Sequence, residues 1–234
     1  LSVGSLVALA SVVSALFLRD YQGGAAAGVS SVFGATLLGI VTCMVVGGFN
    51  GVMITMFRLP PFIVTLGVML MASGLAFRLA AGASIPELPR AYFWLGGGTV
   101  SGIPNPILMM VLLYAVAYVL MSRTVFGRYV YAIGSNPEAA RLSGVPITPC
   151  LIGVYMISGC LAGLGGIVLS SMLQAGDPKF GLMYELEVIA SVVVGGTSLA
   201  GGRGKVLGTL IGAFIIAVIK NGMNLTNIDP FNQK

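Results

Sequence analysis

Long apolar runs constrain this chain more than any other feature of its sequence. A helix that crosses the hydrocarbon core of a bilayer needs about 20 mainly apolar residues. Seven stretches approach or reach that length, at 1–18, 31–49, 60–79, 106–121, 149–172, 184–199 and 206–221. Only 8% of the residues are charged and 57% are hydrophobic, whereas soluble domains carry about 25% charged residues. The sequence therefore predicts an all-α fold, a polytopic transmembrane helical bundle.

The longest polar segment interrupts this pattern between the fourth and fifth predicted spans, at residues 127–146, with the sequence GRYVYAIGSNPEAARLSGVP. Asn136 suits an N-cap, and Pro137 follows at the first helical position, where its missing N–H costs nothing. Glu138 would lie in the first turn, near the positive end of the helix dipole. Gly144 supplies a C-terminal stop. The segment predicts a short, capped helix outside the membrane.

Four motifs, taken together and in their order along the chain, resemble those of one family. They are LSVGS at 1–5, LPPFIVTLG at 59–67, GRYVYAIGSNPEAARLSGVPI at 127–147 and YELEVIASVVVGGTSLAGGRGKVLGTLIGA at 184–213. Together they resemble the permease, the membrane subunit, of ribose-type sugar importers of the ATP-binding-cassette (ABC) class. The resemblance covers nearly the whole chain. It implies a multi-pass protein of the bacterial cytoplasmic (inner) membrane that imports a ribose-like monosaccharide.

The resemblance also implies partners. They are cytoplasmic ABC ATPase subunits, an extracytoplasmic sugar-binding protein, a second permease chain that is identical or similar, and membrane lipid. The capped loop would be cytoplasmic and would transmit the motion of the ATPase. Residues expected to take part in this coupling are Gly127, Arg128, Asn136, Glu138, Ala139, Ala140, Arg141, Ser143 and Gly144.

The sequence predicts no enzyme activity in this chain. There is no histidine, the commonest general base at neutral pH and a frequent metal ligand. The segment GGRGKV at 201–206 departs from the phosphate-binding loop G-x-x-x-x-G-K-[ST], since Leu199 replaces the first glycine and Val206 the hydroxyl residue. We expect no cofactor, no metal and no nucleic acid as partner. The cysteines Cys43, Cys150 and Cys160 suit buried small apolar residues rather than a zinc or disulfide framework.

Candidates for a solute path are few, because a neutral sugar needs hydroxyls, amides and aromatic faces more than charge. We expect them near the start of the third span and before the last span: Asn50, Phe62, Thr65, Gly195, Gly196, Thr197 and Ser198. Glu185 and Glu187 would be costly if they faced lipid. They are expected at the outer interface, with the alternative that they point into protein or water.

Charge alone does not orient the chain. With the capped loop inside, alternation of seven spans leaves six basic residues on each side of the membrane, and the orientation rule counts basic residues.

Residues 34–62 and 208–231 share three short motifs in the same order. The first motif is GATLLG in one copy and GTLIG in the other, and NG and then PF follow in both. By the same alternation of spans the two copies run in opposite directions, which predicts an inverted repeat of the kind found in transporters.

Tyr92 and Trp94 in the loop 80–105 suit a membrane–water interface.

We expect residues 1–234 to form one transmembrane permease domain, incomplete because an N-terminal portion and a last helix are missing. Alternatives stay open. One is an ABC permease for another small solute, such as a branched-chain amino acid, a nucleoside or a furanosyl signal. Others are an ion-driven secondary transporter, for which the glycine pairs at 195–196 and 201–202 leave room, and a non-transporting scaffold. The sequence does not choose the cargo.

Overall fold

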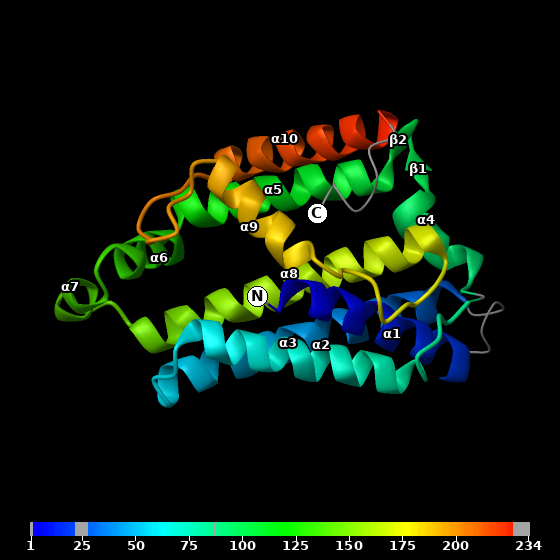
Figure 1. Cartoon of the computed structure of the whole chain (residues 1–234), viewed down its shortest axis with the longest axis horizontal. Coiled ribbons are helices and arrows are strands. Elements are labelled where there is room, and N and C mark those ends of the chain that lie inside the picture. Colours follow the sequence, from blue (N-terminus) through cyan, green and yellow to red (C-terminus); the bar gives the residue numbers. More distant parts are fainter. Residues whose placement is uncertain (1, 22–27, 87, 227–234) are drawn as a thin grey trace. The chain divides into compact units, whose positions relative to one another are not determined.

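Long helices dominate the computed structural model, which describes residues 2–21, 28–86 and 88–226 (Figure 1). Within that part, six helices are long and apolar enough to cross a membrane. They are α1 (Val3–Tyr21), α2 (Val29–Met56), α3 (Pro61–Leu79), α5 (Asn105–Arg123), α8 (Ile147–Leu173) and α10 (Val206–Leu225). Each coincides with a predicted span, so the prediction of a polytopic helical bundle is confirmed. Helix α2 is longer than expected, because it continues through Asn50 and Gly51 to Met56.

One of the seven predicted spans is wrong. The run 184–199 forms α9 (Tyr184–Val194), which has only 11 residues. At 1.5 Å per residue this helix is about 16 Å long, against about 30 Å for the hydrocarbon core. Gly195 and Gly196 follow directly, and Gly196 has a φ of 83°, a left-handed conformation that ends the helix. The chain then continues without regular structure to Lys205.

The remaining elements are short. They are α4 (Arg90–Gly97), a hairpin of β1 (Thr99–Val100) and β2 (Ile103–Pro104), α6 (Val125–Ser135) and α7 (Pro137–Leu142). The hairpin is antiparallel, with Thr99 opposite Pro104. The sequence predicted α7 but neither α4 nor α6 as a separate helix.

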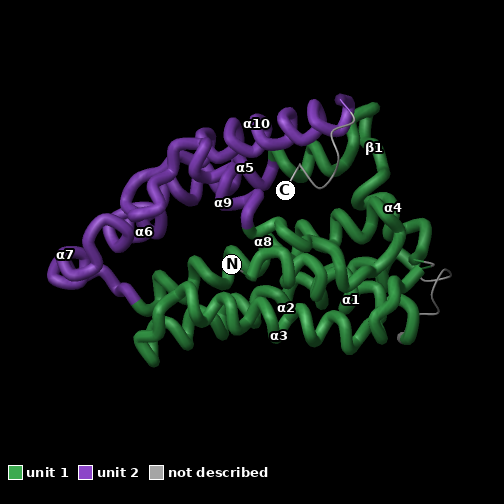
Figure 2. Tube along the Cα trace, viewed as in Figure 1, with its two compact units in different colours: residues 1–111, 148–185 green, residues 112–147, 186–234 purple. Residues whose placement is uncertain are grey.

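The described chain falls into two compact units, coloured separately in Figure 2. Unit 1 contains residues 1–111 and 148–185, and unit 2 contains residues 112–147 and 186–234. In unit 1, α1 is the central helix, since 67% of its span is buried, against 22% for α2 and 28% for α3 and α8. Helices α2 and α3 pack against α1 and against each other. The core of this unit is therefore built around α1.

Glycines allow α2 and α8 to approach closely in unit 1. A Cβ on Gly51 of α2 would lie 2.7 Å from the Cα of Ile152 on α8, and a Cβ on Gly163 of α8 would lie 3.2 Å from the Cα of Ile40 on α2. The two helices therefore run in opposite directions. A Cβ on Gly159 would overlap the carbonyl oxygen of Cys43. Close approach at small residues of this kind is typical of helices that pack in membranes.

The loop after α3 carries a core residue where an interfacial aromatic was expected. Tyr92 on α4 is 0% exposed, whereas Trp94 is 56% exposed. The Tyr92 hydroxyl shares a hydrogen bond of 3.1 Å with the Ser14 hydroxyl and donates to the carbonyl of Ile167 at 3.4 Å. Burial raises the pKa of the Tyr92 phenol, so it stays neutral. The interfacial interpretation is therefore wrong for Tyr92, which ties α4 to α1 and α8.

Unit 2 pairs α9 with α10 in opposite directions. A Cβ on Gly195 would lie 2.6 Å from the carbonyl carbon of Gly208, and one on Gly212 would lie 2.7 Å from the nitrogen of Gly195. Farther along, the Lys220 ammonium on α10 forms an ion pair with the Glu187 carboxylate on α9. Both contacts require the two helices to run side by side from the turn towards the start of α9.

The inverted repeat stays a prediction. Its first copy, residues 34–62, extends from α2 to the start of α3, and its Asn50 and Gly51 are buried on α2. In the second copy, on α10, Asn221 and Gly222 are exposed. The PF pair of that copy, at residues 230–231, lies outside the described residues.

Candidate functional site

Helix α7 has the capped geometry that its sequence predicts. The Asn136 side-chain oxygen accepts hydrogen bonds from the backbone N–H of Glu138 at 3.0 Å and of Ala139 at 3.1 Å. Pro137 occupies the first helical position. Two of the N–H groups that a helix start leaves unpaired are thereby satisfied. A six-residue helix has little stability of its own, and these caps fix where it begins.

The C-terminal end of α7 is fixed in the same local way. Gly144 has a φ of 79°, and its N–H donates to the carbonyl of Arg141 at 3.0 Å. The N–H of Val145 donates to the carbonyl of Ala140 at 3.0 Å, which closes the turn in the manner of a Schellman motif. The left-handed conformation explains why glycine stands here. Both ends predicted from the sequence are thus confirmed.

The exposed face of α7 differs in two residues from the expected coupling set. Ala140 is 4% exposed, so its methyl group packs inward and is not available to a partner. Leu142, which the sequence interpretation left out, is 80% exposed. Glu138 and Arg141 are exposed and joined by a salt bridge of 2.8 Å, which contributes little at such a surface. An apolar residue inside a polar segment was the available signal for Leu142.

Gly127 and Arg128 lie on α6, not on α7. Thr124 caps this helix by accepting from the N–H of Gly127 at 3.3 Å. Gly127 is buried, and a Cβ there would lie 2.6 Å from the Cα of Met121 at the end of α5. Its position explains a close crossing of α5 and α6. Arg128 is exposed in the next position.

Helices α6 and α7 share a single junction residue. The backbone N–H of Asn136 donates to the carbonyl of Ala132 at 3.1 Å and ends α6, while its side chain begins α7. Behind the junction, the Tyr131 hydroxyl donates to the carbonyl of Gly204 at 2.9 Å. The turn before α10 therefore contacts α6.

Of the three predicted path residues in unit 1, Asn50 and Thr65 are polar, and each donates a hydrogen bond within the protein. Asn50 is 1% exposed, and its amide nitrogen donates to the Ser2 hydroxyl at 3.5 Å, while no hydrogen-bond partner is found for its oxygen in the described part of the chain. Thr65 donates back to the carbonyl of Pro61 at 2.8 Å within α3. Phe62 is 63% exposed on the same helix. Their role in a path stays a prediction.

The predicted path residues of unit 2 form the turn after α9. Gly195 packs against Gly208, and Gly196 adopts the left-handed conformation. Thr197 lies beside Gly204, where a Cβ would come within 2.8 Å of the Thr197 methyl carbon. The backbone N–H of Ser198 donates to the carbonyl of Arg203 at 2.9 Å. The described contacts of these four residues are those of a tightly packed turn.

Both acidic residues at the start of α9 have protein partners. The Glu185 carboxylate accepts from the backbone N–H of Gly4 at 3.0 Å. The Glu187 carboxylate pairs with Lys220, and the two side chains are 34% and 42% exposed. Pairing of both groups favours the alternative in which they point into protein, while their depth in the membrane stays a prediction.

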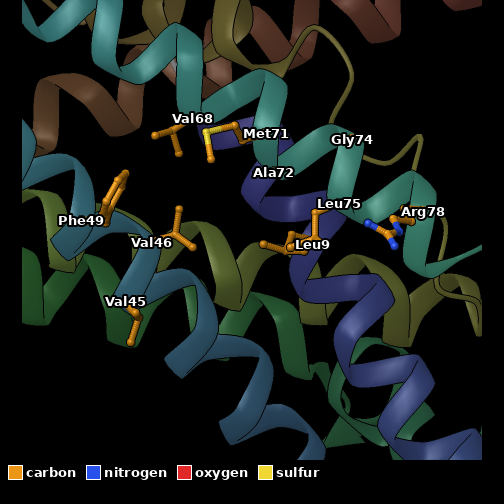
Figure 3. Close-up of a pocket in the computed structure, with 10 residues that line it drawn as sticks. All are labelled: Leu9, Val45, Val46, Phe49, Val68, Met71, Ala72, Gly74, Leu75 and Arg78. Carbon is orange, nitrogen blue, oxygen red and sulfur yellow. The ribbon is translucent and has the colours of Figure 1, made fainter.

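A cavity of about 620 Å³ lies among α1, α2 and α3 in unit 1 (Figure 3). Its wall consists of apolar side chains and one cation: Leu9, Val45, Val46, Phe49, Val68, Met71, Ala72, Gly74, Leu75 and Arg78. Sites for polar small molecules place several hydrogen-bonding groups towards the ligand. This lining offers a sugar only Arg78, so the cavity is unsuited to a polyhydroxyl solute.

Comparison with known proteins assigns the chain to a family. Residues 1–233 match the family described as "Branched-chain amino acid transport system / permease component". The chain belongs to this family. Members of this description are membrane components of transport systems, which agrees with the six long apolar helices of the described residues. The chain is therefore an integral membrane permease component.

Similar proteins carry more specific names. The chain is 41% identical to the ribose import permease protein RbsC of Bacillus subtilis and 38% identical to that of Escherichia coli. It is 36% identical to the L-arabinose ABC transporter permease protein AraH of Azospirillum brasilense. All of this chain is covered in each comparison, with 70%, 71% and 66% of the respective relative. No solved structure matches the chain.

Proposed function

We propose that this chain is the permease subunit of an ATP-driven importer of a ribose- or arabinose-like monosaccharide in the bacterial inner membrane. The observation that carries the proposal is the similarity to ribose and arabinose permeases along the whole chain, at 36–41% identity. The scarcity of charge supports it, since a neutral sugar requires no buried ion relay. A branched-chain amino acid, named in the family description, is the competing cargo.

ATP hydrolysis is assigned to separate cytoplasmic ATPase subunits. The chain's GGRGKV segment lacks two residues of the phosphate-binding pattern and forms the turn that leads into α10. Helix α7 would insert into a groove of the ATPase, as amphipathic helices commonly do. Its exposed residues Glu138, Arg141 and Leu142 would form the contact, together with Ala139, Ser143 and Gly144.

In this mechanism two permease chains, identical or similar, enclose the solute path. An extracytoplasmic binding protein delivers the sugar from outside. ATP binding closes the ATPase pair, and α7 passes that motion to α5 and α8, the spans on either side of it in sequence. The path then alternates between outward-facing and inward-facing states. The rigid caps of α7 support this role, because a frayed helix would absorb the motion.

The test is uptake by the full-length protein in proteoliposomes with its ATPase and binding protein. Labelled pentoses, hexoses and leucine are supplied outside, with ATP inside, with and without an ionophore. We expect pentose uptake that requires ATP and survives the ionophore. An ATPase variant unable to hydrolyse ATP is the control and should abolish uptake.

Two outcomes would contradict the proposal. Uptake that ignores ATP and collapses with the ionophore would indicate an ion-driven carrier, with Glu185 and Glu187 as candidate ion ligands. ATP-dependent uptake of leucine without uptake of any sugar would assign the chain to the amino-acid importers.

A further inference from the structure

The turn between α9 and α10 packs on α6 through backbone atoms. A Cβ on Gly134 of α6 would lie 2.7 Å from the nitrogen of Gly202, and one on Gly202 would lie 2.8 Å from the Cα of Ser135. A Cβ on Gly201 would overlap the carbonyl oxygen of Gly134. Contacts of this kind leave no room for any side chain. They hold the two segments at one separation and in one register.

The same turn has a backbone conformation that favours glycine. Gly201 and Gly202 have φ values of 89° and 72°, which other residues rarely adopt. Beyond them, the Tyr131 hydroxyl of α6 donates to the carbonyl of Gly204 at 2.9 Å. This hydrogen bond is partly buried and joins residues that are 73 positions apart in the sequence. We call the contact of Tyr131, Gly134 and Ser135 with 201–204 the glycine joint.

The glycine joint is continuous with α9 and α10. Thr197 packs beside Gly204, and the Ser198 N–H donates to the carbonyl of Arg203 at 2.9 Å. One turn further along, Gly195 and Gly208 meet through backbone atoms. At the opposite end, α6 is joined to α7 by the single residue Asn136. An unbroken series of close contacts thus leads from α7 through α6 to α9 and α10, all within unit 2.

We propose that the glycine joint is a coupling element that transmits movement of α7 to the α9–α10 pair. This inference rests on the proposed function. It adds a third route by which movement leaves α7, beside the covalent connections of α7 to α5 and to α8. Tyr131, Gly134, Gly201 and Gly202 are positioning residues in it, since they touch neither ATP nor solute. Packed backbone contacts and a partly buried hydrogen bond are the kind of physical network that can carry such coupling.

The test compares two conservative variants in the reconstituted full-length transporter. Tyr131→Phe removes only the hydroxyl that binds Gly204. Tyr129→Phe is the matched control, because the Tyr129 hydroxyl has no hydrogen-bond partner among the described residues of the chain. The measurements are ATPase affinity, ATP hydrolysis and sugar uptake on the same preparation.

We expect Tyr131→Phe to keep its ATPase affinity and its hydrolysis rate while it hydrolyses about fivefold more ATP per sugar imported, the factor that corresponds to one net hydrogen bond. Tyr129→Phe should match the wild type. Gly202→Ala should show a larger loss of coupling than Gly222→Ala on α10, where a Cβ would meet nothing within 4 Å.

Equal ATP-to-sugar ratios for Tyr131→Phe and Tyr129→Phe would overturn the inference. A fall in ATPase affinity that accounts for the whole loss of uptake would overturn it too, because the joint would then only support the docking surface. If the wild type itself shows no ATP-dependent uptake, the proposed function fails and this inference falls with it, which is a distinct result.

Discussion

Leu142 on α7 gives the sharpest test of the coupling contact. The side chain is 80% exposed on a helix outside the predicted spans. If the ATPase covers it, Leu142→Ala removes three carbon atoms from an apolar contact. Each buried CH₂ is worth about 0.8 kcal/mol, so three of them at this exposure are worth about 2 kcal/mol. That corresponds to about 25-fold weaker binding of the ATPase at each contact.

The assay is titration of the purified ATPase onto the full-length permease in detergent or nanodiscs. Leu199→Ala is the matched control, because Leu199 is 78% exposed and lies in the turn after α9 rather than on α7. We expect Leu142→Ala to weaken binding by about one order of magnitude or more, and Leu199→Ala to leave it unchanged. An affinity for Leu142→Ala within about threefold of the wild type, below what even one CH₂ should contribute, would refute the reasoning. So would an equal loss in both variants.

Three further predictions concern backbone and charge. Gly144→Val forces a β-branched residue into a left-handed conformation at a cost of about 1–3 kcal/mol. We expect it to lower uptake while the amount of permease in the membrane stays normal, whereas Gly144→Asn should keep most of the uptake. Equal uptake in both variants would count against the role of the helix stop. Gly159→Ala should destabilise unit 1 by about 1–3 kcal/mol in thermal unfolding, because its Cβ would overlap the Cys43 carbonyl oxygen. Gly74→Ala on α3 should not, because a Cβ there would meet nothing within 4 Å. Similar unfolding temperatures of the two variants would contradict the packing argument. Lys220→Met leaves the Glu187 carboxylate without its partner and should lower the unfolding temperature more than the double replacement Lys220→Met with Glu187→Met. Equal unfolding temperatures of the two variants would contradict this, because the unpaired carboxylate would then carry no penalty.

The features that the sequence predicts well are local ones. Asn136, Pro137 and Gly144 lie within nine residues, and their caps depend only on neighbours in the chain. The long helices follow from run length and apolar content in the same way. Coupling to an ATPase is a different kind of prediction, because it came from the resemblance and not from the geometry of these residues.

The features that the sequence does not predict depend on distant contacts. Run length alone suggested that 184–199 crosses the membrane, and the glycine pair at 195–196 was the overlooked sign that α9 ends early. Tyr92 is buried because Ser14 and Ile167 surround its hydroxyl, and neither is near it in sequence. The glycine joint requires residues about 70 positions apart to meet, and glycines in a turn do not specify what they will pack against.

The central position of α1 has a consequence for the order in which the protein is made. Helices α2 and α3 follow α1 in the chain, whereas Gly166 and Gly176, which also pack against α1, lie in or beyond α8. About 125 residues are therefore synthesised after α1 before α8 begins at Ile147. At about 5–20 residues per second the ribosome needs about 6–25 s for that stretch. During this time the hydroxyls of Ser5, Ser11 and Ser14 can each donate to the carbonyl three residues earlier, as they do in the folded chain. These internal bonds let a helix destined for the protein interior wait in lipid without unpaired hydroxyl donors.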